Sequence, residues 1–74
     1  MRIISKDKLE GLREMYKAGT RVRLLQMDDP YVTLAHGSLG TVEHVDDMGT
    51  IHVSWDCGSS LGVVYGVDSC EIVS

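Results

Sequence analysis

The sequence predicts a mainly β domain in which one N-terminal amphipathic helix precedes a small, strongly bent barrel of five strands. The chain has 74 residues and no apolar run near the roughly eighteen that cross a bilayer, so one domain over residues 1–74 and no membrane partner are expected. The apolar spacing changes from helical to alternating near Gly19. Five short β-type runs then alternate with turn residues, and a barrel would close their edges.

The helix is expected over residues 5–17. Leu9, Leu12 and Tyr16 recur there at helical spacing, with oppositely charged residues three or four positions apart around them. A helix of about three turns is marginal in isolation. We therefore expect its apolar stripe to pack against the strands.

Capping residues lie at both ends of this helix. Ser5 or Asp7 can accept backbone hydrogen bonds in the first turn, and Asp7 has Glu10 three positions later, as in a capping box. At the other end, Gly19 can adopt the left-handed conformation that terminates many helices.

The strands are expected between residues 20 and 74. Aspartate and glycine separate most of them, because both residue types favour turns, and one proline interrupts the chain where a ladder would lose its amide donor. The expected strands are 20–25, 40–45, 50–55, 61–65 and 69–73.

The Asp-Asp-Met-Gly turn between the second and third strands allows two registers. A three-residue loop with a left-handed glycine places His44 opposite His52, so that the two rings share a face. A four-residue loop places His44 opposite Ile51 and Val42 opposite Val53. Burial favours the second register, because it pairs two valines.

Glycine- and aspartate-containing motifs recur after the helix. They are Gly19-Thr20-Arg21-Val22-Arg23-Leu24, Met27-Asp28-Asp29-Pro30-Tyr31, Gly40-Thr41-Val42, Val45-Asp46-Asp47, Gly49-Thr50-Ile51-His52-Val53, Trp55-Asp56, Gly58-Ser59-Ser60-Leu61 and Gly66-Val67-Asp68-Ser69. These motifs closely resemble a small bacterial and phage family called domain of unknown function 4314. The Gly-Thr-Val and Val-x-Trp-Asp-x-Gly motifs also resemble those of SH3-like barrels. The resemblance implies a binding or accessory module, often carried on mobile elements and prophages, and it brings no catalytic residues.

Charge is divided unevenly along the chain. All seven Lys and Arg residues lie in the first 23 positions beside three acidic residues, which gives +4, while the remainder has eight acidic residues and no Lys or Arg. A phosphate-binding face needs several cations close together, and the strands supply only Arg21 and Arg23. Nucleic acid is therefore not an expected partner, and the acidic turns favour a protein with a basic surface.

Catalysis by cysteine is not expected. Cys57 and Cys70 match no zinc or redox spacing, and the acidic neighbour Asp56 disfavours a reactive thiolate at Cys57. The N-terminal sequence lacks the apolar core of a secretory signal, so a cytoplasmic protein with free thiols is expected. Because neither cysteine has the surroundings of a catalytic thiol, the sequence predicts a protein that is not an enzyme.

No metal or cofactor is predicted either. The histidines, His36, His44 and His52, are too few for the usual four zinc ligands. The Asp46-Asp47 doublet lacks the alternating ligands and distal glutamate of a calcium loop. We expect the aspartates of the turns to accept nearby amide hydrogen bonds instead.

The expected function is protein–protein interaction by a non-catalytic module. Trp55 is expected in the core, because residues 51, 53 and 55 alternate on one face. Two other hypotheses remain open: an acidic mimic of nucleic acid that inhibits a host nucleic-acid-binding protein, and an oligomer that binds a small ligand between protomers. The candidate partner-binding residues lie in or beside turns and are expected to form one rim: Asp28, Asp29, Tyr31, Asp56 and Tyr65.

Overall fold

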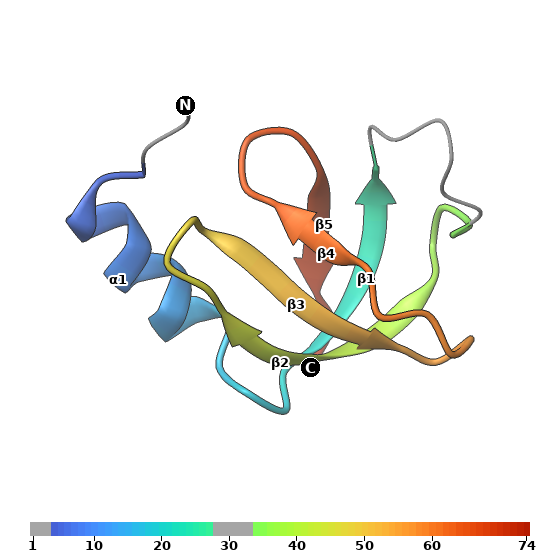
Figure 1. The fold of residues 1–74 in the computed structure, drawn as a ribbon. Helices are drawn as coiled ribbons and strands as arrows, with labels where there is room; N and C mark the ends of the chain where they lie inside the picture. Colours follow the sequence, from blue (N-terminus) through green and yellow to red (C-terminus); the bar gives the residue numbers. More distant parts are fainter. Residues whose placement is uncertain (1–3, 28–33) are drawn as a thin grey trace.

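The computed structural model describes residues 4–27 and 34–74, and it confirms a mainly β fold with an N-terminal helix (Figure 1). The described strands form one antiparallel sheet in the order β4-β3-β2-β1-β5, and their ends lie within one residue of the predicted bounds. The elements are α1 (Lys6–Met15), β1 (Arg21–Gln26), β2 (Leu39–Val45), β3 (Thr50–Trp55), β4 (Gly62–Val64) and β5 (Ser69–Ile72).

The sheet is not closed into the predicted barrel. β4 and β5 are its two edges. Within the described residues, the two edges are not paired as strands, and only one isolated bridge, between Tyr65 after β4 and Asp68 before β5, lies between them. The connection from β4 to β5 is a tight turn, in which the N–H groups of Val67 and Asp68 both donate to the Val64 carbonyl. The turn and the Asp68 side chain use both the C=O and the N–H of Val64, so these groups are not available for a ladder between β4 and β5.

The core lies on one face of the sheet and is covered in part by α1. Trp55 is 2% exposed, which confirms its predicted place, and its indole Nε1–H donates to the Leu61 carbonyl at 2.8 Å. Alternation along β1 and β3 directs inward the side chains of Val22, Leu24, Ile51, Val53 and Trp55. The buried apolar side chains of the described residues are Leu12, Val22, Leu24, Val42, Val45, Ile51, Val53, Trp55 and Val63.

The apolar stripe of α1 packs on the core as predicted, but the helix is shorter than expected. Ser5 caps its first turn, since its hydroxyl accepts from the Lys8 N–H at 3.2 Å. The helix ends at Met15. Gly19 is left-handed, with φ +93°, yet it lies in the turn to β1, where its N–H donates to the Val42 carbonyl. No helix of the described residues is both long and apolar enough to cross a membrane.

The β2–β3 hairpin contains parts of both predicted registers. His44 lies opposite His52, so the preference for a four-residue loop is wrong. Val42 nevertheless lies opposite Val53, because an extra residue of β2 bulges out between Val42 and His44. The bulge makes a tight loop compatible with the pairing of the two valines. The loop has its left-handed glycine, Gly49 with φ +83°, and Val42 and Val53 are both buried in the core.

Candidate functional site

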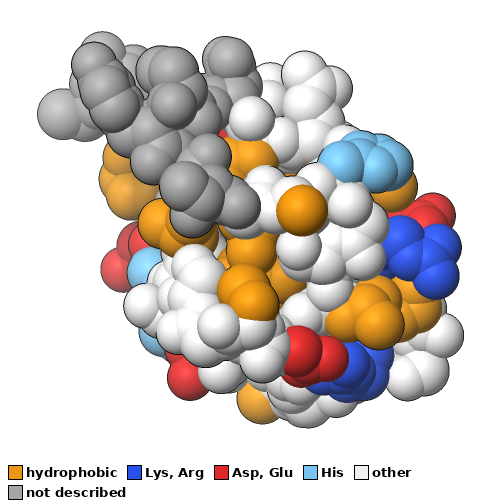
Figure 2. Space-filling view, turned by 90° about the vertical axis from the view of Figure 1, so that its right-hand side faces the viewer, with side chains coloured by type: hydrophobic (Ala, Val, Ile, Leu, Met, Phe, Trp, Pro, Cys, Tyr) orange, Lys and Arg blue, Asp and Glu red, His pale blue; other side chains and the backbone are white. Residues whose placement is uncertain are grey.

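The positive first segment and the acidic strands neutralise each other in part. On the face that Figure 2 shows, Lys and Arg side chains lie beside acidic ones at the right and lower margins. The described arginines of the positive segment are among the paired cations. In the described part of the chain, three salt bridges each join an arginine of the first 23 residues to a later carboxylate: Arg13–Asp47 at 2.7 Å, Arg21–Asp56 at 2.6 Å and Arg23–Glu71 at 2.8 Å.

Asp56, which was predicted to contact a partner protein, pairs with Arg21 of the same chain. Its carboxylate accepts two hydrogen bonds from the Arg21 guanidinium, at 2.8 and 2.6 Å, and Arg21 also donates to Thr41 Oγ1. Hydrogen bonding to Arg21 holds the pKa of the Asp56 carboxyl below its usual value, and the same bond raises the pKa of Arg21. Asp56 is thus half of a surface ion pair rather than an unpaired acidic contact.

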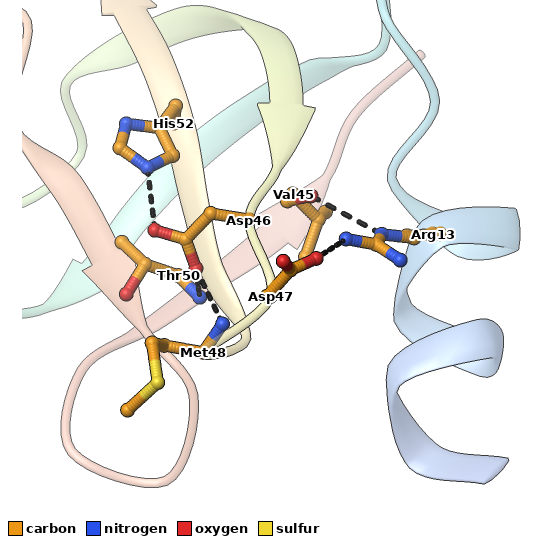
Figure 3. Close-up of polar contacts among 7 residues, drawn as sticks. All are labelled: Arg13, Val45, Asp46, Asp47, Met48, Thr50 and His52. Carbon is orange, nitrogen blue, oxygen red and sulfur yellow. Dashed lines mark hydrogen bonds and ion pairs between the residues drawn. The ribbon is translucent and has the colours of Figure 1, made fainter. Parts of the chain in front are cut away.

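Asp46 organises the β2–β3 turn, as Figure 3 shows. Its Oδ1 accepts the N–H groups of Met48 and Thr50, both at 3.0 Å, and its Oδ2 accepts from His52 Nε2 at 2.8 Å. The His52 bond, followed by these backbone bonds, lowers the pKa of the Asp46 carboxyl. The predicted turn role of this aspartate is confirmed. Figure 3 also shows the Asp47 carboxylate facing Arg13 of α1 beside this turn.

The two histidines of this hairpin stack on each other. The ring centroids of His44 and His52 are 4.4 Å apart, and the ring planes differ by 10°. The nitrogen lone pairs of stacked rings lie in parallel planes, so they do not converge on one ion. Within the described residues, no group of three or more His, Cys, Asp or Glu side chains is arranged to hold a metal.

Of the predicted rim residues, the structure describes Asp56 and Tyr65, and it does not bring these two together. Asp28, Asp29 and Tyr31 lie outside the described residues. Asp56 follows Trp55 at the end of β3, whereas Tyr65 follows β4, whose Val64 pairs with the first residue of β3. Six residues of strand separate these two positions, a span of about 20 Å. Asp56 and Tyr65 therefore lie at opposite ends of the β3–β4 pair and do not form one surface.

A cavity of about 650 Å³ lies between α1 and the turn from β4 to β5. We call it the apolar groove. One helical face forms its first wall with Gly11, Leu12 and Met15, and the turn forms the second wall with Tyr65 and Val67. The spacing of the helical residues, at i, i+1 and i+4, places them on one side of α1. A cavity of this size is within the range of ligand and peptide pockets.

The floor of the apolar groove belongs to the core and carries few polar atoms. Ile51 and Val63 are 3% and 2% exposed there. Tyr16 and Cys70 line its inner end, where burial raises the pKa of the thiol. Burial, then the neighbouring Cys70, also raises the pKa of Tyr16. Both side chains are therefore uncharged at neutral pH.

Apolar side chains at the rim of the groove remain exposed. The exposed fractions are 58% for Met15, 43% for Val67 and 37% for Tyr65. Lys8 covers part of Tyr65, because its Nζ donates to the phenol oxygen at 3.2 Å and lies 5.6 Å from the ring centroid. Of the two predicted site residues that the structure describes, Asp56 and Tyr65, only Tyr65 belongs to this groove. Met15 and Val67 were not identified as site residues from the sequence. An apolar residue in the Gly66-Val67-Asp68 turn, where polar residues are usual, could have pointed to Val67.

The chain matches no curated protein and no solved structure. The family model described as Domain of unknown function (DUF4314) matches residues 5–73, which include α1 and all strands of the described sheet. This match confirms the resemblance seen in the turn motifs. The chain therefore belongs to the DUF4314 family.

Proposed function

We propose that this domain is a non-catalytic module for protein–protein interaction, and that a partner protein inserts an apolar side chain into the apolar groove. The exposed rim carries this proposal. Met15 and Val67 are 58% and 43% exposed around a cavity of about 650 Å³, whereas Val22 and Val53 in the same sheet are fully buried. An exposed apolar cluster beside a concavity is typical of an interaction site.

Charge near the groove favours a partner with a basic surface. Asp7 and Glu14 lie four before and three after Gly11, so the three residues share one side of α1, and both acidic residues are exposed. Asp68 adds a carboxylate on the opposite wall. The one cation of the described lining, Lys8, is engaged with Tyr65. A partner whose apolar side chain is flanked by Lys or Arg complements this arrangement.

The described cysteines support a role without catalysis. Cys70 is half-buried, and this burial raises the pKa of its thiol, which keeps the thiol protonated at neutral pH. Cys57 is exposed at a turn beside Asp56. An activated thiol needs a lowered pKa or an adjacent base, and the raised pKa of Cys70 is the opposite of this. The three arginine–carboxylate bridges of the described residues also reduce the acidic surface on which the nucleic-acid-mimic hypothesis depends.

Two exposed methionines supply a matched test. Met15 is 58% exposed in the groove, and Met48 is 57% exposed at the β2–β3 turn, outside the groove. We expect a protein captured from an extract of the source cells to be retained by the wild-type domain and by Met48→Asp but lost by Met15→Asp. Mass spectrometry of the three captures, with circular dichroism to verify folding, makes the comparison.

Equal capture by both variants would contradict a role for the groove. Capture that is unaffected by Met15→Asp but disappears at about 0.5 M salt supports the acidic mimic instead, because exposed charges are then largely screened. A small molecule that co-purifies with an oligomer, seen by native mass spectrometry, supports the ligand-binding alternative. Each result separates the proposal from one of its rivals.

A further inference from the structure

The sheet offers a partner a second kind of contact, at the outer edge of β5. We infer that the segment bound in the apolar groove is an extended strand that pairs with this edge. The inference rests on the proposed function, and it specifies the partner's conformation. Strand addition uses backbone hydrogen bonds for affinity and alternate side chains for specificity.

At the other edge of the sheet, the chain itself occupies the outward backbone groups of Val64 in β4. At β4, the outward N–H of Val64 donates to Asp68 Oδ2 at 3.0 Å. The outward Val64 carbonyl accepts the N–H groups of Val67 and Asp68, at 3.0 and 2.8 Å. The turn after β4 thus occupies the outward groups of Val64, which a new strand at this edge would need. Natural proteins protect exposed sheet edges in this way.

The backbone of β5 has no such protection within the described residues. The Val73 N–H donates to the Arg21 carbonyl, and in an antiparallel ladder the bonded residues alternate. Glu71 therefore faces β1, while the N–H and C=O groups of Cys70 and Ile72 point away from it. Among residues 4–27 and 34–74, β5 pairs with β1 alone, and no hydrogen bond reaches the outer groups of Cys70 or Ile72.

The apolar groove and the open edge are continuous. Cys70 lines the groove and lies opposite the buried Leu24, and Ile72 lies opposite the buried Val22 on the same face. Ile72 is nevertheless 43% exposed, because no described strand covers it on its outer side. A segment paired with β5 would point every second side chain toward this face. One of these side chains would enter the groove, and another would cover Ile72.

Backbone methylation of a bound peptide tests the inference. We would select nine-residue linear peptides from a phage-displayed library on the wild-type domain, and discard those that also bind Met15→Asp. The retained peptide is then synthesised with a single N-methyl group at each position in turn. If it pairs with β5, methylation at alternate positions lowers the affinity about tenfold or more, because each methyl removes a ladder donor, and the positions between change little.

The outcomes separate this inference from the proposed function. Retained peptides whose methylation scan lacks the two-residue period, or which bind as helices, overturn strand pairing and leave the groove intact as a binding site. A selection that yields no peptide sensitive to Met15→Asp overturns both. Isothermal titration calorimetry supplies the affinities for each methylated peptide.

A variant of the edge gives a second readout. Ile72→Pro removes an N–H that points away from β1, so we expect the β1–β5 ladder to remain while peptide affinity falls about tenfold or more. Glu71→Pro removes a donor to β1 instead, and it is the control for general damage to the strand. Unchanged peptide affinity in a folded Ile72→Pro domain overturns the inference.

Discussion

The two ends of the β3–β4 pair differ in how their apolar groups are covered. At the end where β3 stops, Trp55 is 2% exposed, its N–H is bonded to the Leu61 carbonyl, and the nearby Arg21 is paired with Asp56. At the other end, Met15 and Val67 remain largely exposed around the apolar groove. The first end is packed like a protein interior, and the second leaves apolar area in contact with solvent.

Apolar residues at the two ends therefore differ in how much they contribute to folding stability. An apolar side chain buried among β1, β2 and β3 raises the free energy of unfolding by about 25 cal/mol for each Å² of apolar surface removed from water. A half-exposed one at the groove contributes less to folding, and it retains area that a partner can bury. Substitutions at the two ends should therefore separate stability from binding, and the following predictions are ordered by the expected effect.

The largest effect is expected at Trp55. Trp55→Ala should lower the free energy of unfolding by about 3–5 kcal/mol, because it leaves a cavity and an unpaired Leu61 carbonyl. Urea denaturation followed by far-ultraviolet circular dichroism measures the loss. Tyr65→Ala at the groove is the control, and we expect a loss of about 1 kcal/mol or less. Similar losses at both sites would remove the distinction between the two ends.

Two glycine substitutions should act in opposite directions. A Cβ on Gly40 would lie 2.5 Å from Val53 Cγ1 and 2.8 Å from Trp55 Cε3, so Gly40→Ala should destabilise by about 1–3 kcal/mol. A Cβ on Gly11, within α1 at the groove, meets no atom within 4 Å. Gly11→Ala should stabilise by about 0.5–1 kcal/mol, because alanine favours a helix. Thermal denaturation of both variants checks the two signs.

A smaller, pH-dependent effect is expected at the β2–β3 turn. The folded state lowers the pKa of Asp46, so its ionised form stabilises the fold above the unfolded pKa near 4, and this contribution is lost as the pH falls through the folded pKa. Asp46→Asn should cost about 1 kcal/mol or less at pH 6, and the difference from the wild type should shrink below pH 4. Urea midpoints at pH 6, 4 and 3 measure this; a constant difference contradicts the account.

Local pattern was sufficient for the elements of the fold. Alternation at residues 51, 53 and 55 predicted both β3 and the burial of Trp55, and the helical spacing of Leu9, Leu12 and Tyr16 predicted α1 and its packing. Turn chemistry predicted the amide bonds of Asp46. These features depend on neighbours a few positions away, whose periodicity is visible in the chain.

Within the described residues, the candidate site was predicted only at Tyr65, because its walls come from segments that are distant in sequence: Met15 lies on α1 and Val67 follows β4. The ion pairs have the same origin. Arg21 and Asp56 are 35 positions apart, and nothing in their local context indicates that they pair. The bulge in β2 allows a tight loop and the pairing of two buried valines at the same time. Residue spacing alone does not predict it, because each of the two features by itself indicates a different register.

Composition and periodicity thus account for the mainly β class, the order of the strands along the chain, the helix and most of the core. The open edge of the sheet, the pairing of the arginines and the apolar groove depend on how those elements pack. A groove exists only where two surfaces fail to meet completely, as between Met15 on α1 and Val67 after β4. Such a mismatch belongs to three-dimensional packing and leaves no periodic signal in the sequence.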